Sequence, residues 1–204
     1  FLRTKSSKAM LTKSTNPRLV YRGDRHKEIS IKAVSDLNLI YLYWSNRLQD
    51  EKNNYFYFDY DLDNTLLGFF SKDKIIKLDI YNLLMLSTNS QHALSVNNRK
   101  FYWNSIDNYF EPINYDANPA IDRDTPTTTS ASQRFPVSKY LKESFAILEN
   151  KLREIDLENL HFQLKLSGTD LTKADLNKKL IKILNNLEKV KKNYFTNFSD
   201  EKVE

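Results

Sequence analysis

Hydrophobic residues recur at helical spacing in two stretches of the C-terminal half of the chain. Apolar side chains fall every three or four positions from 137 to 155 and again from 171 to 190, which predicts two amphipathic helices. Thr169 or Asp170 is the expected N-cap of the second helix. The polar face of that helix carries lysines, which we expect to face solvent rather than to form a specific anion site: Lys173, Lys178, Lys179, Lys182, Lys189, Lys191 and Lys192.

Two further buried helices are predicted nearer the N-terminus. Residues 35–48 place their apolar side chains at helical spacing behind Ser35, a suitable N-cap. Residues 79–86 form a hydrophobic run that starts with Asp79, and an acidic start complements the helix dipole. By contrast, residues 1–17 are rich in Lys, Ser and Thr with little periodicity, which predicts an extended or poorly ordered lead-in.

β-rich stretches occupy the middle of the chain. The aromatic run at 55–60 predicts a strand, and the stretches 99–104 and 109–115 flank four residues of turn composition, which predicts a β-hairpin. From 116 to 136 the sequence is non-periodic and rich in Asp, Pro, Thr and Ser. A loop of this length is usually functional or disordered. The pattern as a whole predicts an α+β fold.

Composition narrows the class of protein. The 204 residues are 40% hydrophobic and 28% charged, which is typical of a folded globular chain and favours a single core. The absence of cysteine excludes disulfides, thiolate metal sites and cysteine nucleophiles. Three glycines argue against a glycine-rich nucleotide loop. No apolar run reaches the roughly 18 residues of a membrane span, so none is expected in this chain.

A net charge of +5 raises the question of an anionic partner. Sequence-independent nucleic-acid binding requires a clustered basic face, whereas the excess here is modest and includes the Lys/Arg-rich terminal stretches. A nucleic-acid domain that uses its Tyr and Phe residues as stacking surfaces remains an alternative. We do not favour it, because the sequence has no recognisable RNA-binding signature and most aromatic residues fall at core-like spacing.

The predicted hairpin gives the sequence its best candidate for chemistry. A hairpin brings the residues before its first strand beside those after its second, so Asn97 or Asn98 should lie near Asp116. Amide and carboxylate oxygens are suitable ligands for Mg²⁺, which completes its octahedron with water and substrate phosphates. Protein kinases hold Mg²⁺ against ATP in this way, with an Asn from the catalytic loop and an Asp that follows the hairpin.

Three motifs in this region resemble the CotH kinase family, the atypical protein kinases related to spore coat protein H. They are Lys77-Leu-Asp-Ile-Tyr-Asn-Leu-Leu, Asn97-Asn-Arg-Lys-Phe-Tyr-Trp and Phe110-Glu-Pro-Ile-Asn-Tyr-Asp, and they occur in the family's order within residues 77–118. The resemblance implies a kinase-like larger lobe over 35–195, mainly helical, whose hairpin carries the metal site. Residues 1–34 would then be an extended or partial N-terminal region with an incomplete smaller lobe, and 196–204 a C-terminal tail.

The resemblance also implies an activity and its residues. The chain would transfer the γ-phosphoryl group of ATP, with Mg²⁺, to Ser or Thr hydroxyls of a protein substrate. Asp116 matches the metal-binding Asp, and Asn98, less closely Asn97, matches the amide ligand. Arg99 or its neighbour Lys100 could face a nucleotide phosphate, although two exposed basic residues are the simpler interpretation. The resemblance would be compatible with an extracytoplasmic or cell-surface location, but the chain shows no signal peptide.

The chain departs from the family pattern in ways that leave a second hypothesis open. No carboxylate occurs between Thr88 and Val96, where a kinase places its base, and His92 is the candidate replacement. The second metal-binding Asp of the family is missing, and Asn118 or Asp122 could replace it.

The nucleotide-gripping lysine of the smaller lobe is also uncertain. Only Lys27 and Lys32 are available, and neither is a strong match. A catalytically degenerate CotH-like binding or surface-assembly module is therefore the alternative. The Lys-rich helix after Thr169 and the exposed loop from Ile121 would be the first places to look for the contacts of such a module.

Overall fold

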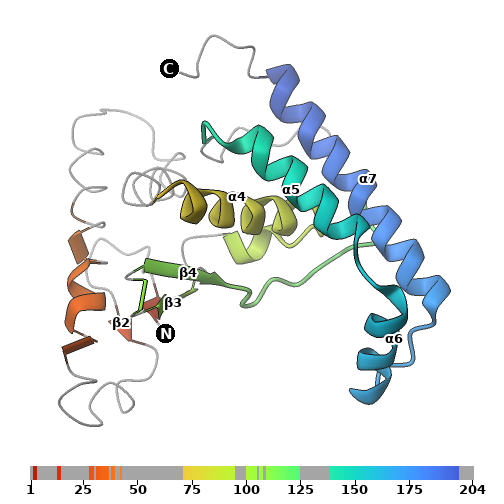
Figure 1. Cartoon of the computed structure of the whole chain (residues 1–204), viewed down its shortest axis with the longest axis horizontal. Helices are drawn as coiled ribbons and strands as arrows, with labels where there is room; N and C mark the ends of the chain where they lie inside the picture. The colour runs from red at the N-terminus through yellow and green to blue at the C-terminus, as the bar shows by residue number, and fades with distance from the viewer. Residues whose placement is uncertain are drawn as a thin grey trace.

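The computed structural model describes a helical body that stands against a small antiparallel sheet (Figure 1). The α+β class predicted from the sequence is confirmed. None of the described helices is long and apolar enough to cross a membrane. The described residues are 71–94, 100–104, 106–107, 109–124 and 138–197, with short pieces at 2–3, 13–14, 28–29, 31–36, 38–39 and 42.

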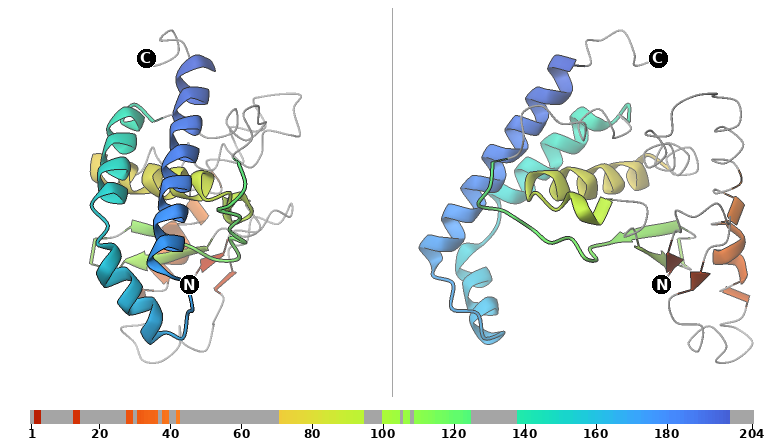
Figure 2. Two further views of the ribbon diagram at one scale, coloured as in Figure 1. Left: turned by 90° about the vertical axis from the view of Figure 1, so that its right-hand side faces the viewer. Right: turned by 180° about the vertical axis from the view of Figure 1, so that it is seen from behind.

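Three helices enclose the hydrophobic core. Helix α4 (Lys72–Ser87) packs against α5 (Leu141–Arg153) and α7 (Lys173–Asn197), which run side by side across it (Figures 1 and 2). The 3₁₀ helix η1 (Gln91–Leu94) closes one end of this core with two buried residues. The apolar faces predicted for α5 and α7 are confirmed, since these residues are buried: Leu141, Phe145, Leu148, Leu152, Leu176, Leu187 and Val190.

The predicted hairpin is also present. Strands β3 (Lys100–Asn104) and β4 (Tyr109–Ile113) pair antiparallel in register, with Trp103 opposite Phe110 and their ring centroids 4.7 Å apart. Two short strands from the predicted N-terminal lead-in, β1 (Leu2–Arg3) and β2 (Lys13–Ser14), extend the sheet in the order β2-β1-β3-β4. The Tyr81 hydroxyl of α4 donates to the Ile113 carbonyl at 3.2 Å and so attaches the hairpin to the core.

The prediction that Asp79 begins a helix is wrong. Helix α4 starts at Lys72, and Asp79 lies buried in its middle with 2% of its surface exposed. Its carboxylate accepts hydrogen bonds from the hydroxyls of Ser138 (2.5 Å) and Ser144 (3.0 Å). These partners offset the cost of burying a carboxylate. They come from some 60 residues further along the chain, which no local pattern can anticipate.

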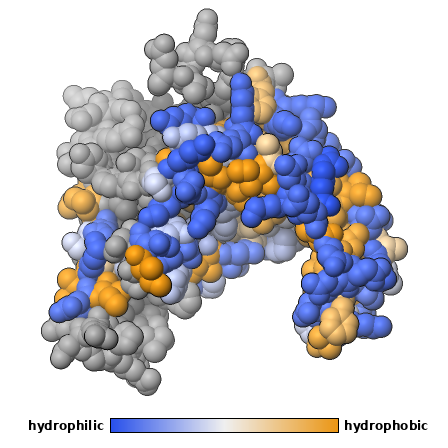
Figure 3. Space-filling model, viewed as in Figure 1, coloured by the Kyte–Doolittle hydropathy of each residue, from blue (hydrophilic) through white to orange (hydrophobic). Residues whose placement is uncertain are grey.

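The predicted cap of α7 is also wrong. Thr172 caps the helix instead, because its hydroxyl accepts from the Asp175 N–H while the Asp175 carboxylate accepts from the Thr172 N–H, both at 3.1 Å. Helix α6 (Leu157–Leu166) was not predicted, and none of its residues is buried. Its apolar side chains are spread around the helix, and three of them, Leu160, Phe162 and Leu166, are exposed. Figure 3 shows hydrophobic surface at the lower right, where α6 lies in this view. A one-sided hydrophobic stripe was therefore absent from the sequence.

Several N-terminal predictions fall wholly or partly outside the described residues. The strand at 55–60 and most of the helix at 35–48 belong to this group. Residues 31–36 are helical, so Ser35 lies within a helical stretch and is not its N-cap.

Candidate functional site

The candidate site begins at the turn that ends α4. Thr88 closes the helix by donating its hydroxyl to the Leu84 carbonyl at 2.7 Å, and Asn89 then adopts a left-handed backbone with φ of 54°. This turn directs the chain into η1, which carries His92 on its exposed side. The stretch that the sequence indicated as a polar loop is thus a short, ordered turn with a defined exit direction.

The second part of the site is the segment that leaves β4. Asp116 and Asn118 both have left-handed backbones, with φ of 50° and 45°, while Ala117 between them is buried in the core. Asp and Asn tolerate this conformation better than other residues with a Cβ atom. The buried Ala117 anchors the segment, and the side chains of Asp116 and Asn118 stay exposed on either side of it.

The two parts meet at His92 and Asp116. The Nε2 atom of His92 lies 3.4 Å from the Oδ2 atom of Asp116, a contact that is an ion pair only when the imidazole is protonated. Both side chains are more than half exposed, so the pair is open to a ligand from solvent. The predicted neighbours of Asp116 were Asn97 or Asn98, which lie outside the described residues, so that prediction is not tested by this pair.

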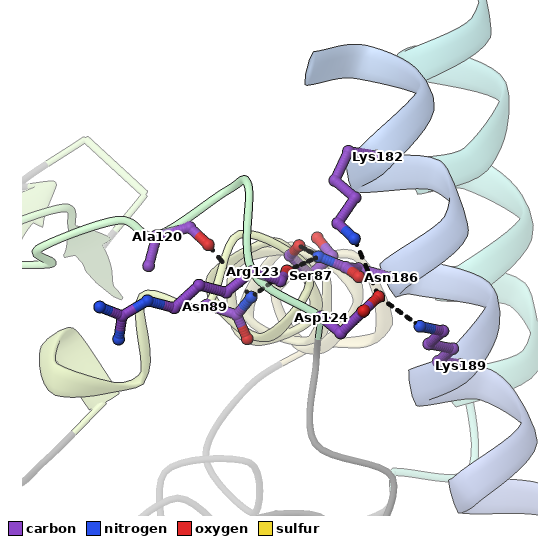
Figure 4. A network of polar contacts seen from close by, with 8 residues as sticks. All are labelled: Ser87, Asn89, Ala120, Arg123, Asp124, Lys182, Asn186 and Lys189. Atoms are coloured by element: carbon purple, nitrogen blue, oxygen red, sulfur yellow. Dashed lines mark hydrogen bonds and ion pairs between the residues drawn. The ribbon is translucent and has the colours of Figure 1, made fainter. Parts of the chain in front are cut away.

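A polar network holds the end of the Asp116 segment against the helices (Figure 4). The Nδ2 atom of Asn89 donates to the carbonyls of Ala120 (3.2 Å) and Arg123 (2.9 Å). The Nδ2 atom of Asn186, fully buried in α7, donates to the carbonyls of Ser87 (3.0 Å) and Arg123 (3.2 Å). The Arg123 carbonyl thus accepts two bonds, which uses both of its lone pairs.

Lysines of α7 bind the same segment through its carboxylates. Lys182 and Lys189 contact Asp124 at 2.8 and 2.5 Å, and these two ammonium groups lower the pKa of Asp124 to about 2. Lys179 contacts Asp122 at 3.0 Å. The prediction that these three lysines only face solvent is wrong, because the Asp-rich segment returns to this helix face. Asp122, weighed as a replacement metal ligand, has its carboxylate engaged here.

A second polar cluster lies between α4 and the hairpin, and no sequence pattern predicted it. Lys74, Lys77, Tyr109 and Glu111 line an open pocket of about 260 Å³ together with apolar residues. The Tyr109 hydroxyl donates to Glu111 and accepts from Lys77. This contact lowers the pKa of Glu111, whereas burial, followed by the bond to Glu111, raises the pKa of Tyr109. The cluster joins elements about 32 residues apart.

The remaining predicted site residues divide into two groups. Asn97, Asn98 and Arg99 lie outside the described residues. Lys32 is described, and it lies in a helical stretch, paired with Asp36 at 3.1 Å, rather than on the strand expected of a nucleotide-gripping lysine. Within the part of the chain that the structure describes, no three His, Asp or Glu side chains form a group that could hold a metal ion.

Comparisons with models of known protein families, with curated protein sequences and with solved structures give no match to this chain.

Proposed function

We propose that the chain is the larger-lobe region of a CotH-like protein kinase, which binds Mg²⁺-ATP at Asp116 and transfers the γ-phosphoryl group to a Ser or Thr hydroxyl of a protein. The observation that carries the proposal is the contact between Asp116, just after the hairpin, and His92, just before it. A helix, a short polar turn, a hairpin and an exposed Asp follow one another in the order that kinases use.

The donor atoms beside Asp116 suit a magnesium nucleotide. Asp116 offers an exposed carboxylate, and Asn118 offers an exposed amide two residues later. These are hard oxygen donors of the kind that Mg²⁺ takes, usually one or two per site, with phosphates and water completing the shell. When bound, Mg²⁺ would neutralise charge on the β- and γ-phosphates. The Lys100 ammonium lies over the ring of Tyr115, next to Asp116, and supplies a nearby positive charge for the same phosphates.

His92 takes the role of the missing carboxylate base in this proposal. An imidazole oriented by a carboxylate accepts a proton from a hydroxyl near neutral pH, as in other Asp-His pairs. One oxygen of Asp116 faces His92, and a carboxylate has about four lone-pair positions, so the same side chain could also contact a cation. His92 would take the acceptor's hydroxyl proton as the oxygen attacks the γ-phosphorus and ADP leaves.

The test measures ATP binding by calorimetry, with and without Mg²⁺, and phosphate transfer from γ-labelled ATP to a Ser/Thr-rich protein. Asp116→Asn is the variant of choice, because Asn keeps the left-handed backbone that Ala would strain. We expect it to weaken Mg²⁺-dependent binding about tenfold or more, since even indirect support of a metal is worth that much. The matched control is Asp73→Asn, an exposed Asp in the first turn of α4.

His92→Gln should leave binding intact and slow transfer by about a hundredfold or more. A folded wild-type protein that binds no ATP in the presence of Mg²⁺ would refute the proposal.

A binding-only relative is the second candidate, favoured by the absence of a carboxylate between Thr88 and Val96. Such a module would keep the nucleotide at Asp116 without turnover. The same experiment separates the two, because ATP binding that depends on Asp116, with no transfer to any acceptor and no effect of His92→Gln, is the result expected of the second candidate alone.

A further inference from the structure

Asn89 lies where the turn after α4 meets the segment after β4. Its side chain donates to two carbonyls of that segment, those of Ala120 and Arg123. In the other direction, the Ala120 N–H donates to the Thr88 carbonyl at 3.1 Å. Three hydrogen bonds therefore join Thr88 and Asn89, in the turn after α4, to residues 120–123, in the segment after β4.

The backbone of Asn89 explains why this residue occupies the junction. Its φ of 54° lies in the left-handed region, which Asn adopts more readily than most residues. The left-handed turn ends the helix, and the side-chain amide is the only part of Asn that can supply two N–H donors to two carbonyls at once. Asp would keep the backbone but lose the donors, and Gly would keep the backbone and lose the side chain.

The junction lies close to the candidate site along both segments. His92 follows Asn89 by three residues, and Asp116 precedes Ala120 by four. The two segments are thus connected at two places, by the Asn89 bonds at one end and by the His92–Asp116 contact at the other. The buried Ala117 anchors the segment between these two places, and the Asn89 bonds add a restraint beyond it, at Ala120 and Arg123.

We propose that Asn89 is a positioning residue, which fixes the Asp116 carboxylate beside His92 and so supports nucleotide-linked Mg²⁺ binding at Asp116. The second half of this inference rests on the proposed function. The first half stands on the hydrogen bonds alone. Asn186 holds the Arg123 carbonyl from α7, whereas Asn89 lies in the turn that leads into η1, three residues before His92.

The experiment compares Asn89→Asp with Asn89→Gly in the full chain. These variants differ in charge, volume and flexibility, and they share the loss of the two amide donors. Asn177→Asp, which changes the same group at an exposed position of α7, is the control for the added charge.

Two readouts do not depend on activity. In both variants, amide exchange at Ala120 and Arg123 should become about tenfold faster, the effect expected for one or two lost hydrogen bonds. When Asn89 is kept, Asp116→Asn should shift the NMR signal of the His92 imidazole. That response should shrink by half or more in the Asn89→Gly background. A general loss of stability would not change it, because it is measured in the folded protein.

A third readout is Mg²⁺-dependent ATP binding, for which we expect a five- to tenfold increase of Kd in both variants. Unchanged exchange in both variants, with an unchanged His92 response in the Asn89→Gly background, would overturn the positioning role. Faster amide exchange in the variants, together with a wild-type protein that binds no Mg²⁺-ATP, would support the positioning of Asp116 and refute the proposed function. Faster amide exchange in the variants with an unchanged Kd for Mg²⁺-ATP would refute the inference that Asn89 supports Mg²⁺ binding at Asp116.

Discussion

Replacement of Asn186 by Ala should destabilise the fold well beyond the effect of an ordinary helix substitution. Asn186 is fully buried in α7, and its Nδ2 atom donates to the carbonyls of Ser87 and Arg123. Each such bond contributes about 1 kcal/mol net, and a buried carbonyl left without a donor costs about 1–3 kcal/mol. The Arg123 carbonyl keeps its bond from Asn89, whereas the Ser87 carbonyl, in the last turn of α4, loses a donor. The expected loss of unfolding free energy is therefore about 2–4 kcal/mol.

Urea unfolding followed by circular dichroism measures this loss as a shift of the midpoint at constant slope. Asn185→Ala is the matched control, because Asn185 is the exposed neighbour of Asn186 on the same helix. Its replacement should stabilise the helix by a few tenths of a kcal/mol through propensity alone. Asn186→Asp should be at least as destabilising as Asn186→Ala, since it sets a carboxylate against two carbonyl oxygens. If Asn186→Ala and Asn185→Ala unfold at the same urea concentration, the reasoning about the buried amide is refuted.

Two other predictions concern the core and the ion pairs. Phe145→Ala should cost about 3–5 kcal/mol of unfolding free energy, because Phe145 is 1% exposed and its ring contacts those of Tyr194 and Phe195. Phe162→Ala, on the exposed side of α6, should change the unfolding free energy by less than about 0.5 kcal/mol, and equal effects of the two changes in the same urea assay would contradict this. The pKa of Asp124 in the folded protein, about 2, lies below its ordinary value. The contacts of Asp124 with Lys182 and Lys189 therefore stabilise the fold above about pH 4, and this stabilisation is lost as the pH falls towards 2. NMR titration of the Asp124 carboxyl carbon should show this low pKa, and Lys182→Gln with Lys189→Gln should raise it; a pKa unaffected by both changes would disprove the role of the lysines.

The helices α5 and α7 and the hairpin could be predicted because their signals are local. The two helices each bury one apolar face, and the hairpin strands are aromatic-rich stretches on either side of a polar turn, so both signals lie in consecutive residues. Helix α6 shows the limit of this reasoning. Its apolar side chains do not gather on one buried face, so no periodic stripe indicated a helix. The start of α4 was missed for a related reason, since three lysines interrupt its first turns.

The candidate site could be predicted in part. The sequence indicated Asp116 and His92 as separate candidates. Hairpin geometry predicted Asn97 or Asn98 beside Asp116, and these two asparagines lie outside the described residues. Asn89, Asn186 and the lysines that bind Asp122 and Asp124 were not predicted as a network. Their partners lie roughly 30 to 100 residues away, and an Asn or Lys on a helix carries no local sign of a distant carbonyl or carboxylate.

The sequence by itself determined which segments form helices and strands wherever one face is apolar, and it determined the order of a hairpin followed by an Asp. Those properties follow from backbone periodicity and side-chain type. Only the tertiary structure decided that Asp79 is buried under two serines, that His92 faces Asp116, and that α7 holds the segment after β4. These contacts depend on the packing of α4, α5 and α7, because a polar side chain finds its partner only after the core has set the distance between the segments.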